Sequence, residues 1–286
     1  MKDAADFEPH RRRLQGLAYR MLGSVAEAED VVQDAYLRWS QAEGVEDDGP
    51  WLVRVATNLS LDRLRKDAVR KEAYRGPWLP EPLIEPLIDD PVERAEEVSV
   101  AFLLALERLS PLERAVFLLH EVFDEDYAQV ATTLGRNEAA VRQLAARARS
   151  HLKDARPRFE VSQDEVQRLV GAFLSAVASG DMTALSELLT EDAVMVTDGG
   201  GKRKAALRPA IGRDDVVQMI QALAWRNPDS FRAPLMPVRI NGYPGVILAQ
   251  YDGPTTLAFQ PGADGKLAGV YVVRNPDKLA HLITPA

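Results

Sequence analysis

The sequence contains no cysteine, which excludes disulfide bonds and zinc sites built on cysteine. It also lacks an apolar run of about eighteen residues, the length that a membrane-spanning helix requires. No apolar stretch follows the basic N-terminal residues, so we expect no signal peptide. Aromatic residues make up only 7% of the 286 residues, whereas 46% are hydrophobic and 27% are charged. This composition is typical of two or three globular domains in the cytoplasm, and it predicts no membrane partner.

Acidic residues outnumber basic ones and give a formal net charge of -8, but the basic residues are unevenly distributed. Residues 51–75 contain seven basic residues and three acids, and residues 136–158 contain seven and two. Acids gather instead at 43–48 and 81–97. This distribution indicates local contact with phosphate groups, together with weak binding to DNA outside a specific complex.

Residues 1–75 show the apolar periodicity of three helices, with an acidic loop before the third. Ser24 and Glu27 form a capping-box pattern at the start of the second helix, and Pro50 suits the first position of the third. Trp39 lies on the apolar stripe of the second helix and is predicted to be buried. Residues 76–94 then contain five prolines, a density that blocks regular helix and favours a linker. The apolar side chains of this linker predict that it docks on the surface of a domain.

Residues 95–156 show the pattern of a helix-turn-helix. Gly135 suits the end of one short helix, and Asn137 suits the cap of the next, which is basic on its exposed side. The pattern favours DNA binding; the alternative is an ordinary helical hairpin with a solvated basic face. The basic segment 58–71 allows the same two interpretations, because basic residues also favour helix ends. The outward-facing residues suited to reading base edges are Arg142, Gln143, Arg147 and Arg149.

After residue 160 the pattern changes to that of an α+β domain over residues 161–286. Helices are predicted at 166–177, 182–189 and 214–224. Short β-branched runs between turn residues predict strands at 194–197, 238–240, 245–249, 256–259 and 268–273.

These residues carry a resemblance to the extracytoplasmic-function (ECF) sigma factors. Residues 7–75 resemble region 2 of that family through the stretches Ala28–Asp34, Trp51–Leu59 and Asp62–Arg65. Residues 95–153 resemble region 4 through Leu109–Pro111 and Val141–Arg149. The resemblance implies two all-α domains followed by an α+β domain. It also implies that the chain directs RNA polymerase to promoters for transcription initiation.

The resemblance implies roles for particular residues. One face of the second helix would bind the clamp of core RNA polymerase, and region 4 would bind its flap. The acidic loop before Pro50 would help to capture a flipped base of the minus-ten element. The residues implied on the polymerase-binding face are Glu29, Asp30, Gln33 and Asp34. The residues implied in promoter binding are Asn58, Arg63, Arg65, Lys66 and Arg136, with the four of the helix-turn-helix.

The rest of the chain resembles one group of this family, which carries a fused SnoaL-like C-terminal domain (SigJ-like). The matching motifs are residues 78–82, 198–202 and 275–279. In that group the domain takes the place of a separate anti-sigma protein. By themselves the three glycines at 199–201 are more typical of a flexible turn, and this segment lacks the spacing of a phosphate-binding loop. The implied regulatory contacts are Trp78, Leu79, Pro80, Asp198, Gly199, Gly200, Gly201, Lys202, Asn275, Pro276, Asp277, Lys278 and Leu279.

One segment departs from the family pattern. Asp124, Glu125 and Asp126 stand where the family has glycine and an aromatic or polar residue. Acids at this place could repel promoter phosphate at the minus-thirty-five element, although acids also suit the N-terminus of a helix.

Other functions stay open at this point. SnoaL-like folds include enzymes, and the residues that could serve one here are Asp192, Asp198, Tyr243, Tyr251 and Asp252. Because no acid–base pair is evident, we expect no enzyme, no cofactor and no metal, whereas a small ligand of the C-terminal domain is left open. The alternative functions are a one-component helix-turn-helix regulator with a ligand-sensing domain and an enzyme domain tethered to DNA. The free chain is expected to be a monomer.

Overall fold

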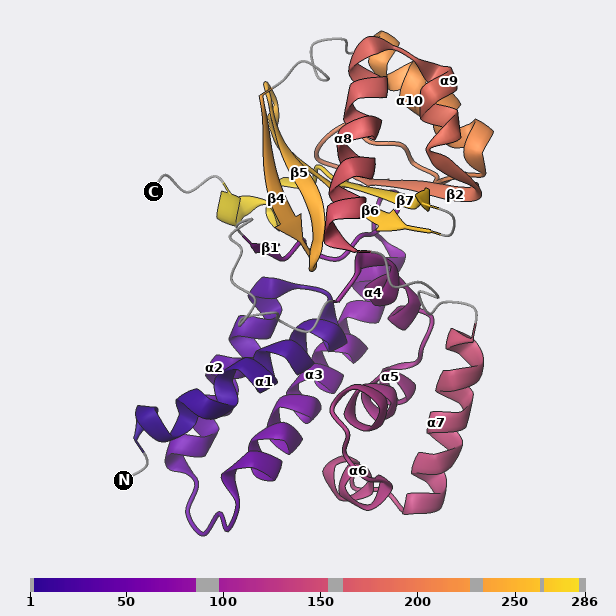
Figure 1. Cartoon of the computed structure of the whole chain (residues 1–286). Coiled ribbons are helices and arrows are strands. Elements are labelled where there is room, and N and C mark those ends of the chain that lie inside the picture. The colour runs from indigo at the N-terminus through magenta and orange to yellow at the C-terminus, as the bar shows by residue number, and fades with distance from the viewer. Residues whose placement is uncertain (1–2, 86–97, 154–161, 227–233, 263–264, 283–286) are drawn as a thin grey trace. The chain divides into compact units, whose positions relative to one another are not determined.

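The computed structural model describes residues 3–85, 98–153, 162–226, 234–262 and 265–282. The chain forms two compact units (Figure 1). The first joins Met1–Ala73 to Leu103–Arg156, and the second joins Tyr74–Phe102 to Pro157–Ala286. The predicted linker therefore begins inside the second unit, and its residues 86–94 lie outside the described residues.

The first three helices follow the apolar periodicity of the sequence. They are α1 (Ala4–Leu22), α2 (Val25–Gln41) and α3 (Asp48–Glu72). Trp39 is fully buried, as predicted, and Ser24 accepts a hydrogen bond from the backbone N–H of Glu27. The prediction that Pro50 takes the first helical position is wrong, because α3 begins at Asp48. The carboxylate of Asp48 suits a helix N-terminus, and proline is tolerated throughout the first turn.

The other helices of this half confirm the predicted helix-turn-helix. After α4 (Val100–Leu106), the chain forms α5 (Pro111–Phe117), α6 (Tyr127–Leu134) and α7 (Glu138–Leu152). Gly135 ends α6 with a φ of 61°, and the Asn137 side chain caps α7 by accepting from the Ala140 N–H at 2.8 Å. A five-residue π-helix, η2 (Leu118–Val122), follows α5. It was not predicted, because apolar spacing does not mark a single widened turn.

The second unit contains a mixed sheet in the order β1-β4-β5-β6-β7-β2-β3, where β2 and β7 are parallel and the other pairs antiparallel. The strands are β1 (Ile84–Glu85), β2 (Leu189–Asp198), β3 (Ala210–Ile211), β4 (Leu235–Ile240), β5 (Tyr243–Gln250), β6 (Gly253–Pro261) and β7 (Leu267–Val273). The helices are α8 (Gln163–Ser179), α9 (Met182–Glu187) and α10 (Arg213–Arg226), followed by the 3-10 turns η5 (Pro276–Lys278) and η6 (Ala280–Leu282).

One face of the sheet packs against α8, α9 and α10 around a single apolar core (Figure 1). Phe173 of α8 meets Phe259 of β6 edge to face, with ring centroids 5.2 Å apart. All five predicted strands and all three predicted helices are confirmed, with shifted ends. The two-residue strands β1 and β3 were not predicted, because so short a run has no detectable alternation.

Candidate functional site

The row of residues on α2 that is expected to bind polymerase lies at the surface. Glu29, Asp30 and Gln33 are exposed, and Asp34 is half-buried. Leu37, one turn after Gln33, is 48% exposed although it is large and apolar. Sequence reasoning missed Leu37, and the available signal was an apolar residue outside the buried stripe of α2. An apolar side chain next to a polar exposed row is a composition suited to protein binding.

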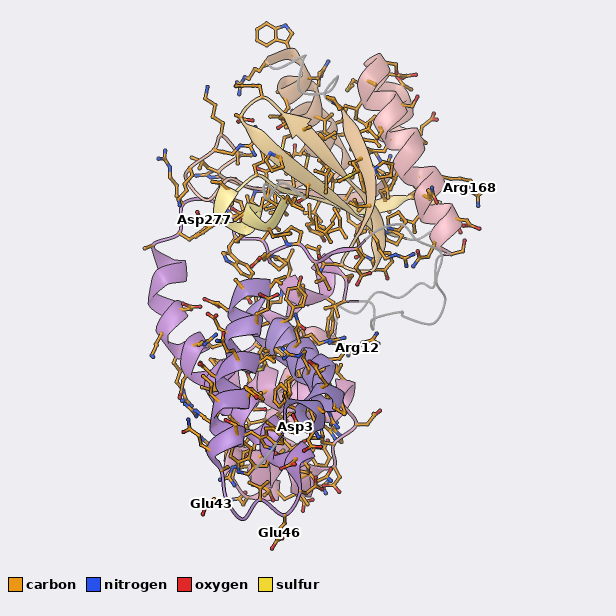
Figure 2. All side chains as sticks on the ribbon, turned by 90° about the vertical axis from the view of Figure 1, so that its left-hand side faces the viewer. Asp3, Arg12, Glu43, Glu46, Arg168 and Asp277 are labelled. Atoms are coloured by element: carbon orange, nitrogen blue, oxygen red, sulfur yellow. The ribbon has the colours of Figure 1, made fainter. Side chains whose placement is uncertain are left out.

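The residues of α3 that were predicted to bind DNA divide into two kinds. Asn58, Arg65 and Lys66 are exposed. Arg63 instead donates through Nη2 to Asp34 at 2.9 Å and through Nη1 to the backbone oxygen of Glu27 at 2.6 Å. It therefore ties α3 to α2 and orients Asp34. The acidic loop before α3 projects away from the helices, with Glu43 and Glu46 at its tip (Figure 2).

The predicted base-reading residues of α7 are exposed, as is Arg136 just before the helix. Three of the arginines are already engaged within the unit. Arg147 Nε lies 3.1 Å from Glu113 Oε1, and Arg149 Nε donates to Glu121 at 2.7 Å. The Arg142 guanidinium pairs with Glu138 and lies 4.3 Å over the Tyr127 ring. Only the pair of Arg142 with Glu138 has both partners exposed, since Glu113 is buried and Glu121 is half-buried. Because exposed ion pairs contribute at most about 1 kcal/mol, phosphate could replace Glu138 at little cost.

The acidic segment before α6 has structural partners. Asp126 caps α6 by accepting from the Gln129 N–H at 2.7 Å. Glu125 pairs with Arg13 of α1 at 3.1 Å, and burial raises the pKa of its carboxyl group despite that charge. The guanidinium groups of Arg13 and Arg20 lie 5.8 and 5.5 Å over the Phe123 ring. Residues 123–126 therefore hold the helix-turn-helix against α1.

A buried arginine forms a second contact between the same two segments. Arg114 of α5 is 4% exposed. It donates to the backbone oxygen of Met21, at the end of α1, at 2.7 Å and to Glu107 at 2.8 Å. A cavity of about 750 Å³ lies beside the contact of Arg13 with Glu125, lined by residues of α1, of α3 and of the 123–133 segment. The two segments that the sequence predicts to be region 2 and region 4 are thus packed together within one unit.

In the second unit, a cluster of polar residues binds the start of the predicted linker, and we call it the clasp. It consists of Tyr74, Trp78 and Leu79 on the linker side, with Asp198, Asn275 and Lys278 on the domain side. Asp198 is fully buried. Its Oδ1 accepts from the Tyr74 hydroxyl at 2.6 Å, and its Oδ2 accepts from the Leu79 N–H at 2.9 Å and from Lys278 Nζ at 2.8 Å.

Lys278 and Asn275 complete the clasp. Lys278 Nζ also donates to the backbone oxygen of Leu79, and it lies 4.3 Å over the Trp78 ring. Asn275 Nδ2 donates to the Tyr74 hydroxyl at 2.8 Å. Two of the predicted motifs, at 198–202 and 275–279, thus hold the third, at 78–82. The role of Tyr74 in the clasp was not predicted, because this residue precedes the motif and only the fold brings it to Asp198.

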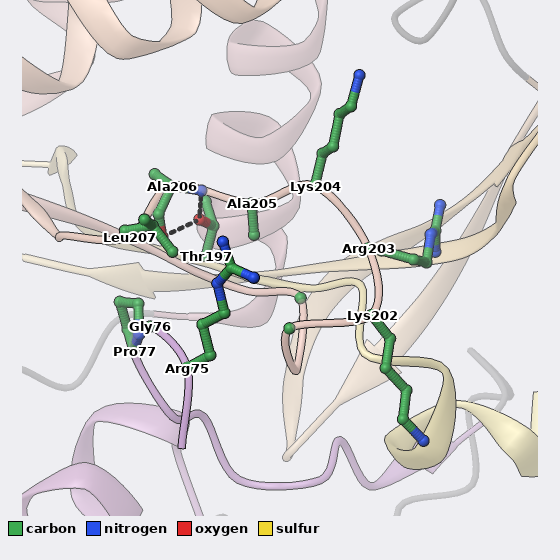
Figure 3. A pocket seen from close by; sticks show the side chains of 12 residues that line it. Arg75, Gly76, Pro77, Thr197, Lys202, Arg203, Lys204, Ala205, Ala206 and Leu207 are labelled. Atoms are coloured by element: carbon green, nitrogen blue, oxygen red, sulfur yellow. Dashed lines mark hydrogen bonds between the residues drawn. The ribbon is translucent and has the colours of Figure 1, made fainter. Parts of the chain in front are cut away.

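The glycine turn after Asp198 is shaped by close contacts. A Cβ atom on Gly199 would lie 2.2 Å from the backbone oxygen of Arg203. One on Gly200, whose φ is 61°, would lie 2.4 Å from Asn275 Cγ. Gly201 faces Arg75, and a cavity of about 320 Å³ separates the turn from residues 75–77 (Figure 3). The turn therefore needs glycine for close approach, in addition to flexibility.

The remaining motif residues support the clasp from outside. Lys202 binds Asp277 with Nζ–Oδ1 at 2.6 Å, and both side chains are exposed. Pro80 and Leu279 are buried, and Pro276 opens η5. Further along the linker, the backbone N–H of Leu83 donates to Asn241 Oδ1 at 3.3 Å, and β1 pairs with β4.

Replacing Tyr74 by phenylalanine is expected to destabilise the clasp by about 1–3 kcal/mol, because it leaves Asp198 and Asn275 short of a partner. Burial and the hydrogen bond to Asp198 raise the pKa of the Tyr74 hydroxyl well above 10. The folded chain therefore keeps this proton longer than the unfolded chain, so its contribution to stability is complete below pH 10 and is lost at higher pH. Between pH 8 and 11, the Tm of thermal unfolding should fall more steeply with pH for the native chain than for Y74F. Parallel curves would contradict this assignment.

The possible catalytic residues of the C-terminal domain lie in different surroundings. Asp198 belongs to the clasp, and Asp252 accepts hydrogen bonds from Arg203 and Arg274. Asp192 and Tyr251 are exposed, and Tyr243 is half-buried.

Comparisons with known families agree with this geometry. Residues 7–70 match the family Sigma-70 region 2, and residues 99–152 match Sigma-70, region 4. The chain belongs to the ECF RNA polymerase sigma factors, with helical regions 2 and 4 followed by a SnoaL-like α+β domain. It is a DNA-binding protein of transcription initiation that acts with RNA polymerase.

Its relatives include one that shares nearly the whole architecture. The ECF RNA polymerase sigma factor SigJ of Mycobacterium tuberculosis is 38% identical, over 96% of this chain and 93% of that protein. The crystal structure of that SigJ matches with a TM-score of 0.81, covering 97% of this chain and 98% of that one. The probable ECF RNA polymerase sigma factor SigI of the same organism is 32% identical over 98% of this chain and 95% of that protein. In the part of the chain that the structure describes, no helix is long and apolar enough to cross a membrane.

Proposed function

We propose that the exposed row of α2 binds the clamp of core RNA polymerase, that α3 and α7 bind the two promoter elements, and that region 4 binds the flap. The exposure of Glu29, Asp30, Gln33 and Leu37 supports the first role. The exposure of Arg142, Arg147 and Arg149, together with the exposed and weak ion pair of Arg142, supports the promoter role of α7. Asn58, Arg65 and Lys66 would hold the opened minus-ten strand, where stacking and backbone contacts replace duplex stacking.

The packing of region 2 on region 4 carries the proposal that the free chain is inactive. The minus-ten and minus-thirty-five elements lie about 25 base pairs apart, which is roughly 85 Å of B-form DNA. In the first unit α3 and α6 are in contact, and Arg114 and Glu125 bind α1. A pair of regions held this closely cannot reach both elements, so polymerase must separate them. This separation is a shift between two populations of the sigma factor.

We further propose that the C-terminal domain regulates the sigma factor through the clasp. The clasp fixes residues 74–79, which follow α3 in the chain, and so restricts the described part of the linker that joins region 2 to region 4. Five hydrogen bonds to one buried carboxylate or from one lysine make it a switchable contact, because losing either charge breaks the buried ion pair. The proposal includes a monomeric, cytoplasmic chain with no enzyme activity and no cofactor, and a small ligand of the C-terminal domain.

In vitro transcription with purified core polymerase and a promoter library tests the assigned surfaces. We expect start-site-selective transcripts from the native chain. R142A should reduce output about tenfold by loss of base contacts, and N58A should reduce strand opening. Arg168 is exposed on α8 and supplies the control R168A, which should keep full output. A chain that neither associates with core polymerase nor gains selectivity from it would overturn the proposal, as would tight duplex binding without polymerase.

A further inference from the structure

A second cavity in the C-terminal domain has walls of two kinds, and it adjoins the cavity beside the glycine turn, with which it shares the lining residues Thr197, Lys204, Ala205 and Ala206. It lies between the sheet and α10, and its volume is about 100 Å³. One end is polar, with Lys204, Gln250, Thr255, Asp252 and Arg274. The other end is formed by the apolar side chains of Met195, Leu223, Leu248, Leu257 and Val272.

The polar end carries an excess of positive charge. Arg274 Nη2 donates to Asp252 Oδ2 at 2.9 Å, and Arg203 pairs with the same carboxylate. Arg203 is only 8% exposed, and its Nε has no hydrogen-bond partner among the described residues. Lys204 is exposed at the cavity, and no ion pair joins it to another described residue. Burial and the neighbouring Arg203 lower the pKa of Arg274, in keeping with too little negative charge.

We propose that this cavity binds a small carboxylate that carries one apolar group, such as an aryl ring. The apolar wall would cover the ring, and the carboxylate would lie at Lys204, where it offsets the charge shared by Arg203, Arg274 and Asp252. The volume of about 100 Å³ excludes a fused ring system, and a single ring can enter only with part of the ligand extending through the opening of the cavity to solvent.

The cavity and the clasp share two strand ends. Arg274 lines the cavity, and the next residue, Asn275, donates to Tyr74. The backbone N–H groups of both donate to the backbone oxygen of Asp198, at 2.7 and 3.0 Å. Thr197 also lines the cavity and precedes Asp198, and its hydroxyl accepts from the Ala206 N–H at 2.7 Å (Figure 3). An anion bound here should restrict the motion of the ends of β2 and β7 and so stabilise the clasp. This effect on regulation rests on the proposed regulatory function.

Calorimetric titration of the full chain with benzoate and with benzamide tests the site. Benzoate should bind at least about tenfold more tightly, because only the carboxylate meets the cationic end. K204Q should weaken benzoate about fivefold, whereas R208Q, at an exposed arginine in the same loop that does not line the cavity, should not. L223W should fill the apolar end and abolish binding. Equal affinities for the two ligands, no binding of either, or a K204Q variant that binds like the native chain would each overturn the assignment.

Hydrogen exchange with and without benzoate tests the link to the clasp. Exchange of the 74–85 segment should slow when benzoate is bound. If benzoate binds but leaves this exchange unchanged, the cavity is a ligand site that is not coupled to the clasp. The titration tests the ligand site without involving the clasp, so a failure of the site can be distinguished from a failure of the proposed regulation.

Discussion

Replacing Asp198 by asparagine is expected to release residues 74–79 from the C-terminal domain. The carboxylate accepts on both sides, from the Tyr74 hydroxyl at one oxygen and from Leu79 and Lys278 at the other. The side-chain amide of the D198N variant must turn its nitrogen towards one of these donors, which then loses its acceptor. The substitution also removes the negative charge that faces Lys278. Breaking a buried ion pair in this way costs about 3 kcal/mol or more. The amide proton of Leu79 should therefore exchange roughly a hundredfold faster.

Two further variants separate the clasp from a general loss of folding. D277N removes an exposed ion pair with Lys202, so its effect should stay below about 1 kcal/mol. In D198N with K278M the lysine charge is gone as well, and part of the lost stability should return. If the clasp controls the sigma factor, D198N should change promoter output at a fixed amount of core polymerase, and D277N should not. Unchanged exchange at Leu79 in D198N would show that the clasp does not hold the linker.

Replacing Arg114 by methionine is expected to separate region 2 from region 4. Arg114 donates to the Met21 oxygen and to Glu107 from a buried position, so both acceptors lose a charged partner. The loss amounts to about 3–5 kcal/mol of the contact between α5 and the end of α1. The contacts at Glu125 and Phe123 and the packing of α3 against α5 and α6 remain in this variant, so the separated state gains population at the expense of the packed one.

The absence of cysteine makes this separation measurable with two spin labels, at S40C on α2 and S150C on α7, both exposed positions. Pulsed electron–electron double resonance should show one population with a short distance between the labels in the native chain, and a population with a longer and broader distribution of distances in R114M. R108M replaces an exposed arginine two residues before the α5 cap, and it should leave the distances unchanged. Identical distributions in R114M and the native chain would show that this arginine does not hold the regions together.

Much of the fold follows from local patterns. Gly135 and Asn137 mark the turn of the helix-turn-helix, and alternation marks the strands of the C-terminal domain. These signals depend on residues close together in the chain, so the sequence reveals them. The ends of elements were less predictable, as Pro50 shows, because several positions in a first turn accept the same residue.

The contacts between distant segments could not be read in this way. Arg63 looks like a DNA-binding residue beside Asn58 and Arg65, but helix packing turns it towards Asp34. Asp198 and Tyr74 are 124 residues apart and meet only because β2 ends where the linker crosses the domain. The motifs at 78–82, 198–202 and 275–279 were found by resemblance, whereas their mutual contacts required the structure.

The turn at Gly199 and Gly200 has a consequence for how such fused domains diversify. A side chain at position 199 collides with the Arg203 backbone of the same turn, whether or not the linker is bound, whereas one at position 200 collides with Asn275 of the clasp. A descendant that has abandoned this mode of control would be free of the second restriction. A larger residue at position 200 would therefore mark homologous tails that no longer hold their own linker, and a survey of natural variants could sort the two kinds without any biochemical assay.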